Sequence, residues 1–298
     1  MNHSWTLTKF RMLLALRNRA FFFFSVVIPL IALFLFAKVY APRGGAKVAY
    51  VLASVLALTV MGSFWGLSMQ LVIFREQGIL RRFRLAPIDA GEMLLSSIVS
   101  NYILTLPAIV VEIVLARWLL HMDRWGNLLS IFALVLIGSE TFAALGLVVA
   151  SVTNSTQETQ VINNLIWTGF LLLSGATVPL PKLPGWVQHF SLFLPATYLV
   201  TGLQRALLAG TPVTHLAAEI SSLGGCTLLA FFVSRQIFRW EPEEKLPRRA
   251  KAWAAAALVP FVLLGIWESS LGQRRAEARS ILESIDDRPP SGTTQPPR

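Results

Sequence analysis

The sequence predicts an all-α integral membrane protein, and three observations support that fold class. Of the 298 residues, 54% are hydrophobic and 14% are charged, whereas a soluble domain carries roughly 25% charged residues. Uncharged apolar runs of about 20 residues, the length that crosses a bilayer core, recur along the chain. These runs lack the alternation of apolar and polar residues that marks a membrane β-strand. A bilayer is therefore the expected solvent for most of the chain.

Six apolar runs are the expected spans of a membrane domain that covers residues 21–240. They lie at about Phe21 to Ala37, Val48 to Phe74, Met93 to Leu120, Leu128 to Val152, Val161 to Val178 and His215 to Phe238. A seventh run, residues 252–271, is weaker, because its strongly apolar part between Trp253 and Trp267 covers only about 22 Å as a helix. We expect this run to span together with its flanks. A helix that lies on the membrane surface or packs on the bundle is the alternative.

Both ends of the chain are expected to lie outside the bilayer. Residues 1–20 place Trp5 among basic residues, which predicts a cytoplasmic interfacial segment, with a simple basic flank of the first span as the alternative. No small-residue cleavage pattern follows the first apolar run, so we expect that run to remain as a span. Residues 272–298 mix charges of both signs and end in Pro, Ser, Thr and Gly, which predicts a polar, partly disordered tail.

The basic residues are distributed unevenly between the two sides of these spans. The formal charge of +10 comes from 26 Lys and Arg against 16 Asp and Glu. In a soluble protein such an excess suggests nucleic acid, but in a membrane protein it orients the chain. With a cytoplasmic N-terminus, fourteen basic residues lie on the cytoplasmic side, seven on the other side and five in the tail. We therefore expect a multi-pass protein with a cytoplasmic N-terminus and no nucleic-acid partner.

The chain lacks the sequence signs of catalysis. It contains no GxxxxGK[ST] phosphate-binding loop and no GxSxG nucleophile elbow. Its histidines, at positions 3, 121, 189 and 215, are scattered without the spacing of metal ligands. The single cysteine, Cys226, lies in an apolar run and is expected to be a packing residue. We expect no catalytic residue, metal or cofactor in this chain.

The stretch from Phe74 to Ile88 is the first candidate functional segment, and it reads FREQGILRRFRLAPI. We expect Gly78 to end the second span and a short helix to run from Ile79 to Leu85, before Pro87. The apolar residues of that helix are Ile79, Leu80 and Phe83, and its basic residues are Arg81, Arg82 and Arg84. Composition leaves two functions open: docking of a soluble partner, or a solvated loop whose arginines only orient the chain.

A second candidate segment runs from Leu173 to Leu207. Its prolines, Pro179, Pro181, Pro184 and Pro195, cannot belong to one continuous helix, although the residues between them are apolar and aromatic. Broken helical pieces at membrane depth are tolerated only where protein or a water-filled cavity covers them. The segment therefore predicts re-entrant helices, with a structured external loop as the alternative.

Two acidic residues, Glu112 and Glu140, lie inside expected spans, where ionisable groups are costly and often functional. Arg117 is five residues after Glu112, a poor match for pairing within one helix. A partner for either acid is therefore expected on another helix. Two roles stay open: a polar contact that holds helices or protomers together, or a group that lines a substrate route.

Both candidate segments resemble the ABC type-2 exporter permease family, and in particular its drug-exporter branch. The residues that resemble the family's cytoplasmic signature are Arg75, Glu76, Gly78, Leu80, Arg81, Arg82, Phe83, Arg84 and Pro87. Those that resemble its fifth span, re-entrant helices and entry to the sixth span are Ser174, Gly175, Pro179, Pro184, Gly185, Pro195, Tyr198 and Arg205. The departures are mild: Phe83 replaces Leu, Ala86 replaces Thr or Ser, and Gly169 stands where many relatives carry Pro. The resemblance covers roughly Trp5 to Trp240.

The resemblance implies a six-span transmembrane domain with re-entrant helices before the sixth span, in the inner membrane of a bacterium. It implies the permease subunit of an exporter in which a separate P-loop ATPase subunit binds ATP and Mg. That subunit contacts the segment from Arg75 to Pro87, and the resemblance implies that Glu76 and the basic helix of this coupling segment transmit nucleotide-driven motion. A second permease, the same or a paralogue, and membrane lipid are the other implied partners. The implied substrate is a hydrophobic drug or antibiotic-like molecule, with a polysaccharide or lipid precursor as the alternative.

Two rivals from other classes remain. A standalone membrane enzyme that acts on lipids would need convergent polar catalytic groups at one membrane edge, which the sequence does not show. An ion-coupled carrier is expected to show related halves, and the sequence shows no convincing internal repeat. Dependence of transport on a partner ATPase distinguishes the three classes.

Overall fold

The computed structural model describes residues 23–41, 45–84, 90–123 and 125–239, together with a few isolated positions beyond residue 258. Within these ranges the regular structure is helical. The elements in chain order are η1 (Phe23–Val27), α3 (Ile28–Tyr40), α4 (Ala46–Glu76), α5 (Ile79–Arg84), α6 (Ala90–Trp118), α7 (Leu128–Val152), α8 (Thr156–Leu173), η2 (Leu180–Lys182), α9 (Gly185–Ser191), α10 (Pro195–Gln204), η3 (Arg205–Ala209), η4 (Val213–Leu216) and α11 (Ala217–Ile237).

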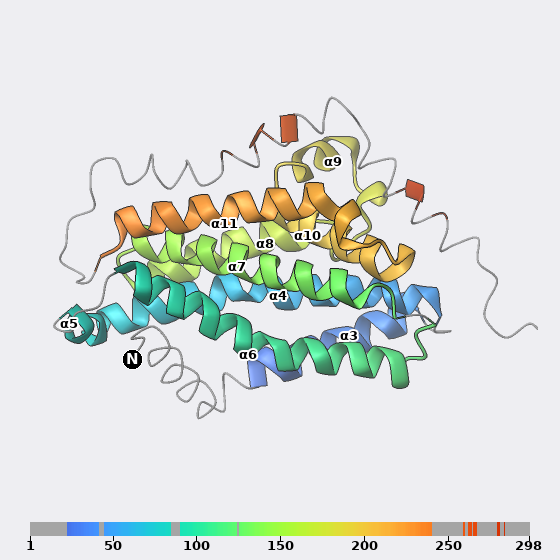
Figure 1. Cartoon of the computed structure of the whole chain (residues 1–298), viewed down its shortest axis with the longest axis horizontal. Coiled ribbons are helices and arrows are strands. Elements are labelled where there is room, and N and C mark those ends of the chain that lie inside the picture. The colour runs from blue at the N-terminus through green and yellow to red at the C-terminus, as the bar shows by residue number, and fades with distance from the viewer. Residues whose placement is uncertain are drawn as a thin grey trace, which may run out of the picture.

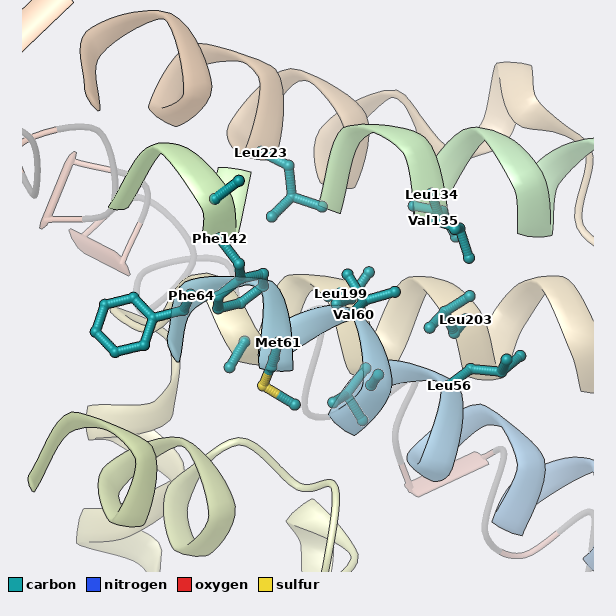
Figure 2. Packing of buried hydrophobic residues seen from close by; sticks show 14 of the residues in the cluster. Leu56, Val60, Met61, Phe64, Leu134, Val135, Phe142, Leu199, Leu203 and Leu223 are labelled. Carbon is teal, nitrogen blue, oxygen red and sulfur yellow. The ribbon is translucent and has the colours of Figure 1, made fainter. Parts of the chain in front are cut away.

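The long helices lie side by side, and α7 occupies the middle of the bundle between α4 and α11 (Figure 1). Short α5 projects at one end of the bundle, and α9 stands beside α10 away from that end (Figure 1). These two ends are called the α5 end and the α9 end below. The core forms where α4, α7, α10 and α11 meet, and Figure 2 shows apolar side chains from all four helices in contact there. Among them, Val60, Phe142, Leu199 and Leu223 are fully buried.

Four helical segments are long and apolar enough to cross a membrane: Lys47–Glu76, Gly91–Trp118, Leu128–Val152 and Val213–Ile237. They correspond to the second, third, fourth and sixth expected spans. A fifth crossing is added if the bent pair Gly185–Ser191 and Pro195–Ala209, which meet at 96°, counts as one span. The described residues therefore support four or five spans by length and composition, and the expected six are not confirmed.

The first and fifth expected spans fall short for different reasons. The first is a five-residue π-helix followed by the 13-residue α3, and Pro29 near the start of α3 cannot donate a backbone hydrogen bond there. The fifth corresponds to α8, which has 18 residues but carries glutamines, asparagines and an acid through its first half. Its polarity, rather than its length, separates it from the apolar spans.

The expected seventh span falls mostly outside the described residues. Val259, Val262, Leu263 and Ile266 are helical and exposed. Gly265 lies so close to the ring of Phe193 that a Cβ atom there would stand 2.4 Å from the ring. Whether residues 252–271 cross the bilayer stays a prediction. Residues 1–20 and the tail at 272–298 also lie outside the described residues, apart from three isolated positions in the tail.

The tightest helix contact brings α7 onto α4 at Gly146. A Cβ atom at this position would lie 2.4 Å from the carbonyl oxygen of Phe64 and 3.2 Å from its carbonyl carbon. Both atoms belong to the backbone, so no side-chain rotation can make room. Small residues allow this kind of backbone approach between helices inside a membrane, where packing rather than water drives association.

Gly146→Ala is expected to push α4 and α7 apart and lower the free energy of unfolding by roughly 1–3 kcal/mol. Thermal unfolding in detergent measures the effect. Gly66→Ala is the matched control, because a Cβ atom at Gly66 in α4 meets nothing within 4 Å. That control is expected to be neutral or to stabilise the helix by about 0.5–1 kcal/mol. Equal stability of the two variants would contradict the close approach.

Candidate functional site

The turn between α4 and α5 has the form that the sequence predicts. Gln77 ends α4, Gly78 adopts a left-handed backbone with φ of 68°, and α5 follows directly. Leu80 of α5 is fully buried, whereas Arg81 is exposed. Residues 82–84 belong to α5 but their side chains are outside the described set, and so is Pro87. The short helix is confirmed, and Leu80 anchors it in the bundle.

Arg75, the first residue of the family-like signature, is buried in the bundle. Its side chain is 1% exposed. One Nη atom donates to the carbonyl oxygen of Ala150 at 2.9 Å, and the other donates to that of Thr153 at 2.6 Å. Both acceptors belong to the C-terminal end of α7. Carbonyls at a helix C-terminus have no partner within the helix and carry partial negative charge, so a buried guanidinium there is favourable.

Arg239, just beyond α11, reaches the same end of α7 from the opposite side and is 4% exposed. It donates to the carbonyl oxygens of Ser151 at 3.2 Å and Thr153 at 2.5 Å, and to Oδ1 of Asn154 at 3.0 Å. In the sequence, Arg239 is one of the fourteen basic residues expected on the cytoplasmic side and has no other predicted role. Its position at the same end of a span as Arg75 was the available signal.

Glu76 joins α4 to the first residue of α8. Its Oε1 atom accepts a hydrogen bond from the backbone N–H of Thr156 at 2.8 Å. The start of α8 is also capped locally, because Ser155 Oγ accepts from the N–H of Glu158 at 3.2 Å while Oε2 of Glu158 accepts from the N–H of Asn154 at 2.7 Å. The pair resembles a capping box, except that Glu158 accepts from the residue before the N-cap Ser155 rather than from Ser155 itself. The Glu76 carboxylate is also favourable here because the N-terminal end of a helix, in this case α8, carries partial positive charge.

These contacts form one structural unit, which we call the junction. It consists of Arg75, Glu76, the turn Thr153–Thr156 and Arg239. It holds together the ends of α4, α7 and α11 and the start of α8 at the α5 end. The turn itself contains no Lys or Arg, and its cations come from α4 and from the end of α11.

At the α9 end, the proline-rich segment folds into short helical pieces, as expected. Pro184 is the N-cap of α9, and Pro195 is the first residue of α10. Ser174 is the C-cap of α8, and Gly175 follows with φ of 86°. Tyr198 is buried and donates from its hydroxyl to the carbonyl oxygen of Leu192 at 2.8 Å, which ties α10 back to the end of α9. Pro179 caps η2, and Gly185 opens α9.

Arg205 forms an ion pair at this end with a residue that the sequence analysis did not single out. Its Nη1 lies 2.8 Å from Oε1 of Glu219, and its Nη2 donates to the carbonyl oxygen of His215 at 3.0 Å. The Arg205 side chain is 20% exposed and that of Glu219 is 0% exposed. The pair fastens the end of α10 to the start of α11.

The two acids inside spans have different environments. Glu112 of α6 is fully buried, and its Oε1 accepts a hydrogen bond from Thr59 of α4 at 2.7 Å. The expected partner on another helix is therefore found for Glu112. Arg117 instead donates to the carbonyl of Met122. Glu140 of α7 is partly exposed, without a hydrogen-bond partner among the described residues. In this conformation Glu112 is a contact between helices, and neither acid's functional role is tested.

The outer face of α8 carries a row of polar side chains that the sequence analysis missed. Gln157, Gln160, Asn164 and Thr168 are exposed, and their spacing of three or four residues places them on one side of the helix. We call them the α8 stripe. From Gln157 to Thr168 the stripe is about 16 Å long at 1.5 Å per residue. On the opposite side, Asn163 is buried and donates to Ser68 of α4 at 2.7 Å.

The family model described as ABC-2 type transporter matches residues 2–208 of this chain. The chain belongs to this family. The resemblance inferred from the two candidate segments is thereby confirmed, and the protein is a multi-pass membrane permease. The matched region contains Arg75, Glu76, the α8 stripe and the proline-rich segment, whereas Glu219 and Arg239 lie beyond it.

The ABC-2 permease is similar to curated proteins from several bacteria. Nodulation protein J of Rhizobium meliloti (strain 1021) is 28% identical over 116 residues, 39% of this chain and 44% of that protein. Linearmycin resistance permease protein LnrN of Bacillus subtilis (strain 168) is 23% identical over 177 residues, 59% and 44% of the two chains. Probable multidrug ABC transporter permease YbhS of Escherichia coli (strain K12) is 26% identical over 171 residues, 56% and 45%. The aligned segments span less than half the length of each relative.

Among the described residues of the permease, no three His, Cys, Asp or Glu side chains lie close enough together to hold one metal ion. Cys226 is buried in α11, where it packs in the core.

Arg75→Ala is expected to destabilise the permease by about 2–4 kcal/mol, because two carbonyls at the end of α7 lose a charged donor in a buried site. Arg75→Lys keeps the charge without the planar fork and is expected to lie between the wild type and Arg75→Ala. Arg235→Ala, an exposed position on α11, is the control and is expected to change stability by less than about 0.5 kcal/mol. Thermal unfolding in detergent measures the stability of each variant. If all three variants were as stable as the wild type, the result would contradict the buried role of Arg75.

The Arg205 and Glu219 pair is expected to show coupling in a double-mutant cycle. Arg205→Ala leaves a buried carboxylate without its cation and is expected to cost about 3–5 kcal/mol. Adding Glu219→Gln removes the stranded charge, so the double variant is expected to be more stable than Arg205→Ala alone. Additive effects of the two substitutions on unfolding would show that the pair does not interact.

Proposed function

We propose that this ABC-2 permease is the membrane subunit of an ATP-driven exporter, in which two permease chains face each other along α8 and a separate ATPase subunit docks at the α5 end. The role of the permease is mechanical. Closure of the ATPase subunits pushes on α5, shifts the spans and opens a route between the two permeases. The second permease is another copy of this chain or a paralogue.

The α8 stripe is the observation that carries this proposal. A helix that faces lipid cannot present a row of side-chain amides without cost, because the hydrocarbon offers them no hydrogen-bond partners, whereas the Thr168 hydroxyl already donates to the carbonyl oxygen of Asn164 within α8. Polar side chains at membrane depth face other helices or a water-filled path. Other helices cover the opposite side of α8 through Asn163 and Phe170. A second permease against the stripe would give its side chains partners and would leave a polar route when the two chains separate.

The α5 end supplies the docking side for the ATPase. Arg81 and Gln77 are exposed there, next to the buried anchor Leu80. An anchored short helix that presents a basic side chain suits a soluble partner. With this end in the cytoplasm, the side with more basic residues faces inward, and the N-terminus is expected to be cytoplasmic. The expected location is the inner membrane of a bacterium.

The substrate class supported best is a hydrophobic drug or antibiotic-like molecule. Two relatives have names that refer to linearmycin resistance and to multidrug transport. Loss of the permease is then expected to sensitise cells to hydrophobic antibiotics. Accumulation of a lipid-linked precursor with unchanged sensitivity would instead indicate export of a polysaccharide or lipid precursor. A lipid-modifying activity in the purified chain without any ATPase would point to an enzyme.

Asn164→Cys in a Cys226→Ser background is expected to form a disulfide between two permeases in native membranes, because the stripe faces its counterpart. Leu228→Cys is the matched control, since Leu228 of α11 is 74% exposed on an apolar face and is expected to face lipid. Non-reducing gel electrophoresis after mild oxidation measures dimer formation. Cross-linking at Leu228 but not at Asn164 would overturn the proposed arrangement.

The partner is tested by purification of the tagged wild-type permease from its own cells. A P-loop ATPase is expected to co-purify, and ATP hydrolysis is expected to be lost when its phosphate-binding lysine is replaced. A pure permease without any ATPase, isolated under conditions that preserve the dimer, would contradict an ATP-driven role.

A further inference from the structure

We propose that Glu76, Arg75 and Arg239 are positioning residues that transmit movement of α5 to α8 and α11, rather than contacts to the ATPase. This inference rests on the proposed function for the source of the movement. The contacts themselves do not depend on it. The resemblance places Glu76 in a segment that meets the ATPase, whereas in the structure its exposed carboxylate accepts a hydrogen bond from the backbone of Thr156 at the start of α8.

Glu76 connects the residues next to α5 with the start of α8. Only Gln77 and Gly78 separate it from the first residue of α5. Its Oε1 atom is engaged by the N–H of Thr156, and the next residue, Gln157, is the first member of the α8 stripe. A displacement of the α4–α5 turn therefore acts on Thr156, which directly precedes the first residue of the stripe.

Arg75 makes this link stiff. While Glu76 holds the start of α8, the neighbouring guanidinium holds the end of α7 through the carbonyls of Ala150 and Thr153. Two consecutive residues of α4 thus form hydrogen bonds to the residues before and after the turn between α7 and α8 and to the turn itself. Thr159 adds a bond from α8 back to Thr153, with Oγ1 atoms 2.8 Å apart. The turn cannot shift relative to α4 unless several of these bonds break.

Arg239 extends the same unit to α11. It shares the carbonyl of Thr153 with Arg75 and binds Asn154 in the turn. Glu219, near the start of α11, pairs with Arg205 at the α9 end, and Arg239 lies just beyond the other end of the helix. The helix α11 therefore runs from the α9 end to the junction. The junction is the one place in the described residues where α4, α7, α8 and α11 are all joined by side-chain hydrogen bonds.

The contact is tested first on the permease alone, in lipid nanodiscs, by hydrogen–deuterium exchange of peptides that contain Thr156. Glu76→Ala is expected to speed exchange of this amide about tenfold or more, because a charge-assisted bond is lost. Glu76→Gln keeps an oxygen acceptor and is expected to have a smaller effect. Arg81→Ala, on the exposed side of α5 and outside the junction, is expected to leave Thr156 protected. Equal exchange in Glu76→Ala and the wild type would overturn the inference.

The transmission is tested on the complex with the co-purified ATPase, with exchange compared before and after ATP and vanadate. In the wild type, peptides of both α5 and α8 are expected to change. In Glu76→Ala the ATPase is expected to remain bound and α5 to respond, while the response of α8 is reduced severalfold. In Arg81→Ala, by contrast, binding of the ATPase is expected to weaken. An unchanged α8 response in Glu76→Ala, or loss of the ATPase from that variant, would overturn the positioning role.

Arg239→Lys provides a second test if Glu76→Ala does not fold. It retains the charge but cannot reproduce the planar spread of donors with which three nitrogens of Arg239 reach three separate acceptors, and it is expected to reduce the response of α11 peptides to ATP. Absence of any ATPase in the wild-type preparation would count against the proposed function. Exchange at Thr156 would still decide whether the junction contact forms.

Discussion

The need to satisfy the buried C-terminal end of α7 shapes the permease more than any other constraint. This helix lies in the middle of the bundle, and its residues from Thr141 to Ser151 are buried without exception. Its last carbonyls therefore have little access to water, and the turn that follows offers no cation of its own. Arg75 and Arg239 supply the donors from helices on either side. Termination of one helix thus fixes the relative position of three others.

This arrangement gives two of the basic residues on the proposed cytoplasmic side a second role. Arginines there are ordinarily read as solvated charges that set orientation. Arg75 and Arg239 contribute to the same count, yet they are almost fully buried and bind carbonyl oxygens. An excess of basic residues at one end of a membrane domain can therefore reflect helix termination as well as topology.

The sequence predicted the features that depend on local pattern. The second, third, fourth and sixth spans and the short helix after Gly78 follow from apolar runs and helix-breaking residues, and the structure places them within a few residues of expectation. Broken helices in the proline-rich segment follow from the same rules. The family signature also directed attention to Arg75 and Glu76, although not to the way in which they act.

The features that the sequence did not predict depend on contacts between distant residues. Nothing in the sequence near Arg239 shows that it shares an acceptor with Arg75. The two side chains bind the carbonyl oxygen of Thr153 from different parts of the chain. The α8 helix was expected as an ordinary apolar span, whereas its polar residues divide between a buried contact at Asn163 and an exposed stripe. Glu219 was overlooked because it lies at the start of a span, beside a partner contributed by η3.

The most direct test of the account measures distances between spin labels in the reconstituted complex with and without ATP. Labels at Gln77 and Gln157 within one permease report on the junction, and labels at Asn164 in the two permeases report on the route. The account predicts an unchanged first distance and an ATP-dependent change in the second. A change in the first distance with a constant second distance would show that the junction yields while the route stays fixed, which contradicts the central claim.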